Sequence, residues 1–231
     1  MIYPNLTFTM TTFNRLPLFI ETMNSFLETC LDKFLIKEWI ISDDGSSDED
    51  LQAMQSLYPF LTVLRSPRKG QAANLNYLFS KVTTEWFFHC EDDWRFIKKG
   101  HYLERLFDVA FDSSENKNVV LRHWEGGELK KTKSGIDYNV HVHDPDVPRQ
   151  VHTKNDAWWC GYSLNPGLQH LPTIRLLGKY DESTDISKRT WDRPQAQMYF
   201  ALGLKRANLL GHYIEHIGEG KSAYKFRGSS F

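Results

Sequence analysis

The sequence predicts an α/β fold in which a mainly parallel sheet is flanked by helices. Three observations support this prediction: short apolar runs end in polar turns, helical segments lie between them, and the two kinds of segment alternate. The runs that we expect to form strands are residues 6–10, 39–42, 61–65 and 85–90. The segments that we expect to form helices are residues 17–30, 48–58 and 71–82. Right-handed crossovers would then place all four strand ends at one edge of the sheet.

The fourth apolar run leads into three consecutive acids, Glu91, Asp92 and Asp93. Carboxylates at the end of a buried strand are unfavourable unless a cation neutralises them. Their hard oxygen atoms suit Mg²⁺ or Mn²⁺, ions that retain coordination positions for phosphate oxygens. The alternative is an acidic turn whose Asp caps the next helix. The tripeptide therefore indicates either a divalent metal site or a helix start.

A second acidic turn, residues 43–48 with the sequence Asp-Asp-Gly-Ser-Ser-Asp, follows the second apolar run. An Asp at this position can accept the ring N–H of uracil, thymine or guanine, or a ribose hydroxyl. A turn followed by a helix cap would explain the same residues. The loops that carry Asn14-Arg15 and Arg68-Lys69 would end at the same edge of the sheet. Carboxylates for a base or ribose, a metal site and cations for phosphates together predict a nucleotide diphosphate pocket.

Four motifs in the first 95 residues resemble those of one known family. They are a strand followed by Thr11-Thr12-Phe13-Asn14-Arg15, a strand followed by Asp43-Asp44-Gly45-Ser46, the helical segment at 70–76, and Glu91-Asp92-Asp93. The set is similar to the motifs of GT-A fold glycosyltransferases, specifically the family 2-like group. This resemblance implies a Rossmann-like, twisted, mainly parallel sheet in a single domain. Residues 1–95 would bind the nucleotide sugar and end in the acidic metal motif, and residues 96–231 would bind the acceptor and carry out catalysis.

The resemblance also implies roles for individual residues in the first half. Asp93 would bind the metal, and Glu91 would reach the ribose, a metal-bound water or the ion itself. The residues expected to bind the nucleotide are Thr11, Arg15, Asp43, Asp44, Arg68 and Asp92. Within this set, Asp43 or Asp44 would contact the nucleobase.

In the second half, Asp192 precedes a helical pattern that ends at Gly203, an expected C′ glycine. The resemblance implies that Asp192 is the catalytic base of an inverting enzyme, although Trp191 replaces the usual Glu. A base is needed because the acceptor hydroxyl must lose its proton as it attacks the anomeric carbon. We expect the helix N-terminus and the metal to lower the pKa of Asp192. The alternative role for Asp192 is a simple N-cap.

Other candidates in this half have less specific signals. His216 follows an expected strand at 209–215, and the resemblance implies that it completes the metal shell, with Lys221 in a glycine-rich loop over the phosphates. A structural, hydrogen-bonded histidine is the alternative. Trp158 and Trp159 would stack on a sugar, or else pack in the core. His141 and His143 fit a polar loop or edge strand.

Composition agrees with a single enzyme domain of 231 residues. The net charge of −1 gives no electrostatic reason to expect nucleic acid as a partner. Cys30, Cys90 and Cys160 cannot all pair, which favours a reducing, cytoplasmic location, and no signal peptide or membrane span is evident. We expect residues 125–154 to be a flexible loop.

The sequence therefore predicts a Mn²⁺- or Mg²⁺-dependent glycosyltransferase. It would move a sugar from a nucleotide diphosphate donor, most simply a UDP-sugar, to a hydroxyl of a glycan, glycoprotein or other acceptor. Asp192 as base predicts inversion, and a retaining enzyme is the alternative. A catalytically degenerate carbohydrate- or nucleotide-binding module is the non-enzymatic alternative. The first loop lacks the glycine-rich patterns of nucleotidyltransferases and dinucleotide-dependent oxidoreductases.

Overall fold

A computed structural model describes residues 3–67, 70–122, 127–141, 161–183 and 192–220 of the chain. Within these ranges the main sheet has nine strands in the order β3-β2-β1-β4-β9-β6-β10-β8-β7. Their bounds are β1 (Leu6–Thr12), β2 (Ile36–Asp43), β3 (Thr62–Arg65), β4 (Trp86–Glu91), β6 (Asn116–Val120), β7 (Glu128–Lys131), β8 (Asp137–Val140), β9 (Gly167–His170) and β10 (Lys205–Leu209). A separate antiparallel pair is formed by β5 (Trp94–Phe96) and β11 (Ile214–His216).

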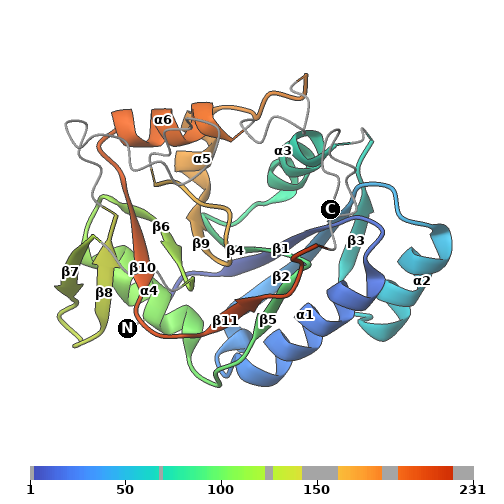
Figure 1. Ribbon diagram of the computed structural model, residues 1–231, viewed down its shortest axis with the longest axis horizontal. Helices are drawn as coiled ribbons and strands as arrows, with labels where there is room; N and C mark the ends of the chain where they lie inside the picture. Colours follow the sequence, from blue (N-terminus) through green and yellow to red (C-terminus); the bar gives the residue numbers. More distant parts are fainter. Residues whose placement is uncertain (1–2, 68–69, 123–126, 142–160, 184–191, 221–231) are drawn as a thin grey trace.

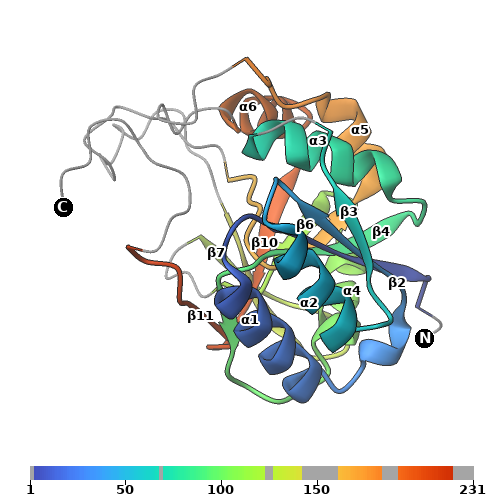
Figure 2. The same ribbon diagram turned by 90° about the vertical axis from the view of Figure 1, so that its right-hand side faces the viewer.

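Helices cover both faces of the main sheet, as Figures 1 and 2 show. The helices on one face are α1 (Leu16–Thr29), α2 (Asp48–Leu57) and α4 (Tyr102–Asp112). Those on the other face are α3 (Gln71–Lys81), α5 (Leu171–Leu177) and α6 (Arg193–Ala201). A short 3₁₀ helix, η1 (Lys33–Leu35), precedes β2. This three-layer arrangement confirms the predicted α/β class.

Aromatic residues explain why the central strands are stable inside the sheet. Phe8 of β1 and Phe88 of β4 are both fully buried, and their rings pack against Phe26 of α1 at centroid distances of 5.0 and 5.4 Å. Phe96 of β5 meets Phe26 edge-on at 4.9 Å. Large apolar side chains supply most of the burial energy of such a core. This cluster packs the middle of β1 and β4 against α1.

The register of the parallel strands places the polar strand ends side by side. Thr12 is opposite Asp43, and Asp43 is opposite Arg65, across β1, β2 and β3. Thr11 is opposite Glu91 across β1 and β4. The predicted meeting of all four strand ends at one edge is therefore confirmed.

One strand in the middle of the sheet runs against its neighbours. β9 pairs antiparallel with both β4 and β6, and so joins the first four strands to the rest of the sheet. Gly167, its first residue, lies so close to β6 that an added Cβ would be 2.7 Å from Cα of Val120. A residue with a side chain would therefore force the two strands apart.

Two predicted segments differ in the structure. The single strand expected at 209–215 is wrong: β10 ends at Leu209, the chain bends through Gly211 at φ 134°, and β11 begins at Ile214. A positive φ of this kind favours glycine and interrupts a strand. The expected loop at 125–154 contains, in its described part, the hairpin of β7 and β8. No helix in the described ranges is both long and apolar enough to cross a bilayer.

Candidate active site

Arg15, in the loop between β1 and α1, binds two of the three consecutive acids. Its guanidinium forms a close ion pair with Asp92 and donates from Nη1 to Oδ2 of Asp93 at 2.9 Å. Although burial opposes the charge, Asp92 and Asp93 raise the pKa of Arg15. The structure thus places Arg15 against the acidic turn, where it supplies one positive charge to three carboxylates.

Asp92 is fully buried beneath this contact. Its other oxygen, Oδ2, accepts a hydrogen bond from Oγ1 of Thr12 at 2.7 Å. Burial raises the pKa of Asp92 to about 6, even though Arg15 and the Thr12 hydroxyl both act in the opposite direction. Because Arg15 and Thr12 occupy its oxygens, Asp92 anchors the loop after β1 to the acidic turn.

Glu91 lies at the last position of β4 and reaches toward the start of α3. Its Oε1 accepts a hydrogen bond from Nε2 of Gln71 at 2.9 Å. Burial and the charges of Asp93 and Asp92 raise the pKa of Glu91 to about 8. The acidic turn therefore holds more negative charge than Arg15 balances, which is the electrostatic situation that a divalent cation relieves.

Among the described residues, one oxygen of Asp93 has no partner. Oδ2 faces Arg15 and lies 3.4 Å from Nε2 of His216, whereas Oδ1 is buried and accepts no hydrogen bond from this part of the chain. A buried carboxylate oxygen without a partner is costly unless a ligand reaches it. This oxygen, together with the oxygen-rich surroundings, fits a hard divalent ion. His216 is the last residue of β11 and lies opposite Trp94 of β5.

The acidic turn after β2 is held by its own backbone. Asp43 accepts hydrogen bonds from the backbone N–H groups of Gly45 and Ser46 at 2.8 and 2.9 Å and from the Ser46 hydroxyl. Both oxygens of Asp44 lie 2.9 Å from the N–H of Gly70, which precedes α3. Both carboxylates are almost fully buried. These hydrogen bonds therefore fix both carboxylates at the edge where the strand ends meet.

Asp192 lies at the N-cap position of α6, but its side chain makes no capping hydrogen bond. Burial raises its pKa, and its charge acts on Glu91, Tyr162 and Tyr180. The expected lowering of its pKa is therefore wrong: at a helix start that leaves the carboxylate partly buried, loss of hydration outweighs the helix dipole. Gly203 is the C′ residue of α6 with φ 71°, as predicted.

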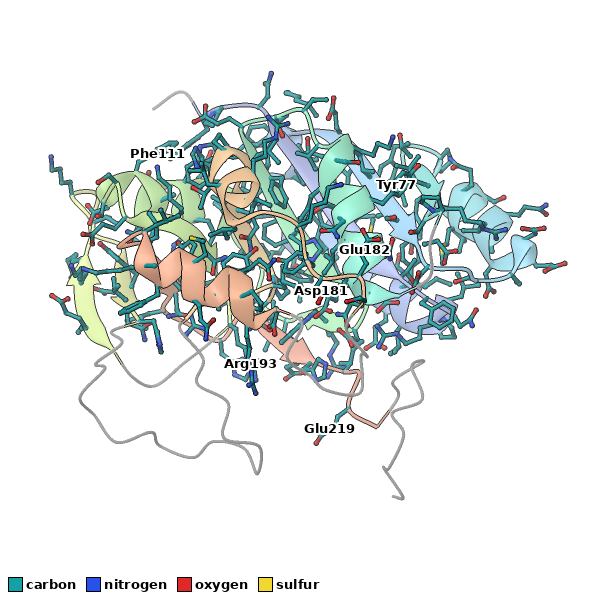
Figure 3. All side chains as sticks on the ribbon, turned by 90° about the horizontal axis from the view of Figure 1, so that it is seen from above. Tyr77, Phe111, Asp181, Glu182, Arg193 and Glu219 are labelled. Atoms are coloured by element: carbon teal, nitrogen blue, oxygen red, sulfur yellow. The ribbon has the colours of Figure 1, made fainter. Side chains whose placement is uncertain are left out.

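Figure 3 shows the side chains of the described residues from above. Arg193, which follows Asp192, and Glu219, which follows Gly218, both project on the same side of the molecule (Figure 3). Nε2 of Gln195 in α6 donates to the carbonyl of Lys179 at 2.7 Å, and the backbone of the next residue, Tyr180, exchanges hydrogen bonds with the side-chain amide of Asn76 of α3 at 2.9 Å. The charge of Asp192 raises the pKa of Glu91, so the two carboxylates lie within electrostatic range of each other.

Several predicted residues lie outside the described ranges: Arg68, Trp158, Trp159 and Lys221. Conversely, sequence reasoning missed Gln71, Thr12 and Arg65, which bind Glu91, Asp92 and the turn after β2 respectively. Arg65 could have been found, because it is the last residue of a predicted strand whose end meets the other three. Thr11, which we expected in the loop after the first strand, lies within β1 and is buried.

A different trio, Asp32, His101 and Glu104, is the one group of three potential metal ligands whose ligand atoms lie within 4.8 Å of one another among the described residues. It lies where α1 ends and α4 begins, at the opposite end of α1 from Arg15. Asp32 accepts hydrogen bonds from the Cys30 thiol at 3.2 Å and from the Glu104 N–H at 2.8 Å. Asp32 therefore caps α4, which explains the group without an ion.

This fold, with acidic strand ends and a basic residue at one edge of the sheet, defines a glycosyltransferase of the GT-A fold. The model of the family described as "Glycosyl transferase family 2" matches residues 7–160, and the chain belongs to this family. Comparison with curated protein sequences gave no significant match.

Two solved structures are similar to the chain. One is the mannosyltransferase PcManGT from Pyrobaculum calidifontis, solved in complex with GDP-Man and Mn²⁺, with a TM-score of 0.58 and 14% identity over 89% of this chain and 55% of that one. The other is TarS 1-349 from S. aureus, with a TM-score of 0.53 and 14% identity over 91% of this chain and 59% of that one. The chain thus spans little more than half of each structure, and the likeness at this identity concerns the fold.

Proposed function

We propose that the protein transfers a sugar from a nucleotide diphosphate-sugar, a UDP-sugar in the first instance, to a hydroxyl of a glycan, glycoprotein or other acceptor. Residues 1–95 bind the donor, and residues 96–231 bind the acceptor and supply the base. The reaction depends on Mn²⁺ or Mg²⁺ and inverts the anomeric centre.

One observation carries this proposal: Asp192 lies at the start of α6 without capping it and acts electrostatically on Glu91 of the acidic edge. A carboxylate that does not stabilise its own helix is available for other chemistry. Its raised pKa makes it a stronger base than an exposed Asp. Asp192 therefore takes the proton from the acceptor hydroxyl as that hydroxyl attacks the sugar.

Asp93, with Glu91 and His216 beside it, would hold the ion. When bound, the ion neutralises the charge that develops on the departing diphosphate. Arg15 fixes Asp93 through its contact with Oδ2 and keeps Asp92 charged beneath it. These contacts prepare the acidic turn before the donor arrives.

Asp43 and Asp44 form the base-reading side of the donor site. A carboxylate there accepts the ring N–H of uracil or guanine, a donor that cytosine lacks at neutral pH. The related mannosyltransferase was solved with GDP-Man. A test of UDP-sugars as donors should therefore include GDP-sugars for comparison.

The decisive experiment is incubation of the protein with a panel of UDP- and GDP-sugars and Mn²⁺, followed by measurement of slow donor hydrolysis. This assay needs no knowledge of the acceptor. Metal-dependent release of UDP or GDP, abolished by EDTA, is the expected result. Tight nucleotide binding without any turnover would indicate a binding module, and retention of anomeric configuration in the product, read by NMR, would contradict the role of Asp192.

A further inference from the structure

Gly218 lies so close to the carboxylate of Asp93 that a Cβ atom at position 218 would clash with it. A Cβ built on Gly218 would be 2.6 Å from Cβ and 2.8 Å from Cγ of Asp93, and nearer still to Oδ2. Gly218 is buried, and its φ lies outside the positive region that nine other glycines occupy in the described ranges. The close approach to Asp93, and not an unusual backbone conformation, is therefore what requires glycine here.

The segment that carries Gly218 cannot move away easily. The backbone N–H of Ile217 donates to the carbonyl of Asp93 at 2.9 Å. One residue earlier, His216 pairs with Trp94 across β11 and β5, and the two rings lie 4.9 Å apart. Main-chain pairing and ring packing thus fix the strand that delivers Gly218.

The Asp93 side chain is equally constrained on its other side. Its Oδ2 is held by Nη1 of Arg15 at 2.9 Å and faces Nε2 of His216 at 3.4 Å. A methyl group on residue 218 would therefore have to push the carboxylate away from Arg15. Such a movement would also turn Oδ1, the oxygen without a partner, out of its present position.

We propose that Gly218 is a positioning residue of the metal site. By its lack of a side chain it lets the segment after β11 close onto Asp93, and so fixes Oδ2 on Arg15 and leaves Oδ1 for the ion. This inference rests on the proposed function, because it assumes that Asp93 binds the metal. Groups that orient a metal ligand typically change metal affinity by about 10- to 100-fold when they are altered.

The test compares Gly218→Ala with Gly100→Ala. Gly100 has an ordinary backbone conformation, and a Cβ there would lie 3.5 Å from Cε1 of Tyr102, a normal contact. For each protein, calorimetry measures UDP and GDP affinity with and without Mn²⁺. We expect Gly218→Ala to weaken the Mn²⁺-dependent affinity about tenfold or more while the metal-free affinity is unchanged, and Gly100→Ala to behave like wild type.

The outcomes separate this inference from the proposed function. If wild type binds with metal dependence and Gly218→Ala binds equally well, the positioning role is wrong and the function stands. If wild type shows no metal dependence, the metal-dependent function fails, and this inference with it. An equal loss with and without Mn²⁺ would show general damage and would also contradict the positioning role.

A second variant covers the case in which Gly218→Ala does not fold. Ile217→Pro removes the N–H that binds the Asp93 carbonyl and adds no atom at position 218. His216 is already in a strand, the conformation that a following proline favours. We expect the same selective loss of Mn²⁺-dependent affinity, to a smaller extent, and wild-type affinity in this variant would overturn the proposal.

Discussion

Nη1 of Arg15 donates to Oδ2 of Asp93 at 2.9 Å, which joins the loop after β1 to the acidic turn after β4. The same guanidinium pairs with Asp92, which is fully buried. One side chain from the loop after β1 thus pairs with two of the three consecutive acids at the end of β4. Five predictions test this arrangement and its chemistry.

Replacement of Arg15 should make the stability of the protein more dependent on a bound metal ion. Arg15→Gln leaves Asp92 buried without its partner, and breaking a buried pair in this way typically destabilises by about 3 kcal/mol or more. Mn²⁺ should then raise the melting temperature of the variant more than that of wild type, because the ion replaces the missing charge. Arg95→Gln is the control, since Arg95 pairs with Glu215 on the surface and should matter little. Equal Mn²⁺ shifts in both variants would refute the prediction.

Asp93→Ala should abolish metal-dependent nucleotide binding and leave the fold intact. Removal of one of three neighbouring carboxylates relieves repulsion, which offsets the lost contacts with Arg15 and His216. Calorimetry with UDP or GDP and Mn²⁺, together with a melting curve, measures both effects. Glu49→Gln, an exposed change on α2, controls for the loss of a negative charge. Retained metal dependence in Asp93→Ala would remove Asp93 from the metal site.

Asp192→Asn should reduce transfer by about 10²-fold or more without weakening donor binding, because Asn cannot accept the proton. The melting temperature of Asp192→Ala provides a control for a capping role. Since Asp192 makes no capping hydrogen bond, Asp192→Ala should not lower the melting temperature, whereas loss of a true cap costs about 1 kcal/mol. A clear loss of stability in the Ala variant with full activity in the Asn variant would identify Asp192 as a cap.

The raised pKa of Asp192 also predicts a pH-dependent difference in stability between wild type and Asp192→Asn. At acid pH the carboxyl is protonated in both folded and unfolded chains, and the two proteins should be equally stable. As the pH rises above the ordinary Asp value, the unfolded wild-type chain ionises first, so the folded wild type loses stability relative to the variant. Melting curves from acid to neutral pH should therefore show a difference in melting temperature between the two proteins that grows with pH. A difference that stays constant would mean that burial does not raise the pKa of Asp192.

Nucleobase preference should follow the carboxylates after β2. CDP should bind more weakly than UDP or GDP, by about 1 to 3 kcal/mol, because cytosine has no ring N–H that could donate to a carboxylate there at neutral pH. Asp44→Asn should reduce this difference, since the amide can also donate. Equal affinities for CDP and UDP would mean that neither Asp43 nor Asp44 reads the base.

The first half of the fold was predictable because its signals are local. Each strand from β1 to β4 is an apolar run that ends in a polar turn, and the helices between them force a parallel order. The same reasoning placed the four strand ends at one edge, where the structure pairs Thr11 with Glu91 and Thr12 with Asp43. The later strands gave no such signal: β9 inserts between β4 and β6 through pairings with residues far away in the chain.

The candidate site was also predictable only where its signals are local in the sequence. The acidic strand ends were visible in the sequence, but the partner of Arg15 was not, since a basic loop residue can reach either a phosphate or a carboxylate. The pKa of Asp192 was predicted in the wrong direction because the sequence shows a helix start and does not show how deeply it is buried. Gly218 gave no usable signal, because only the folded chain brings it onto Asp93.

The position of β9 has a consequence for how the chain folds. β4 and β6 have no direct pairing in the sheet, so each presents an unpaired edge until residues 167–170 arrive between them. During synthesis the first four strands could assemble early, yet they would carry an open, apolar edge of the kind that recruits other chains. Closure of that edge requires a long-range antiparallel pairing and the unobstructed backbone of Gly167. A side chain at this single position should therefore lower the yield of folded protein and increase aggregation, because it would disturb the pairing of β9 with β4 and β6.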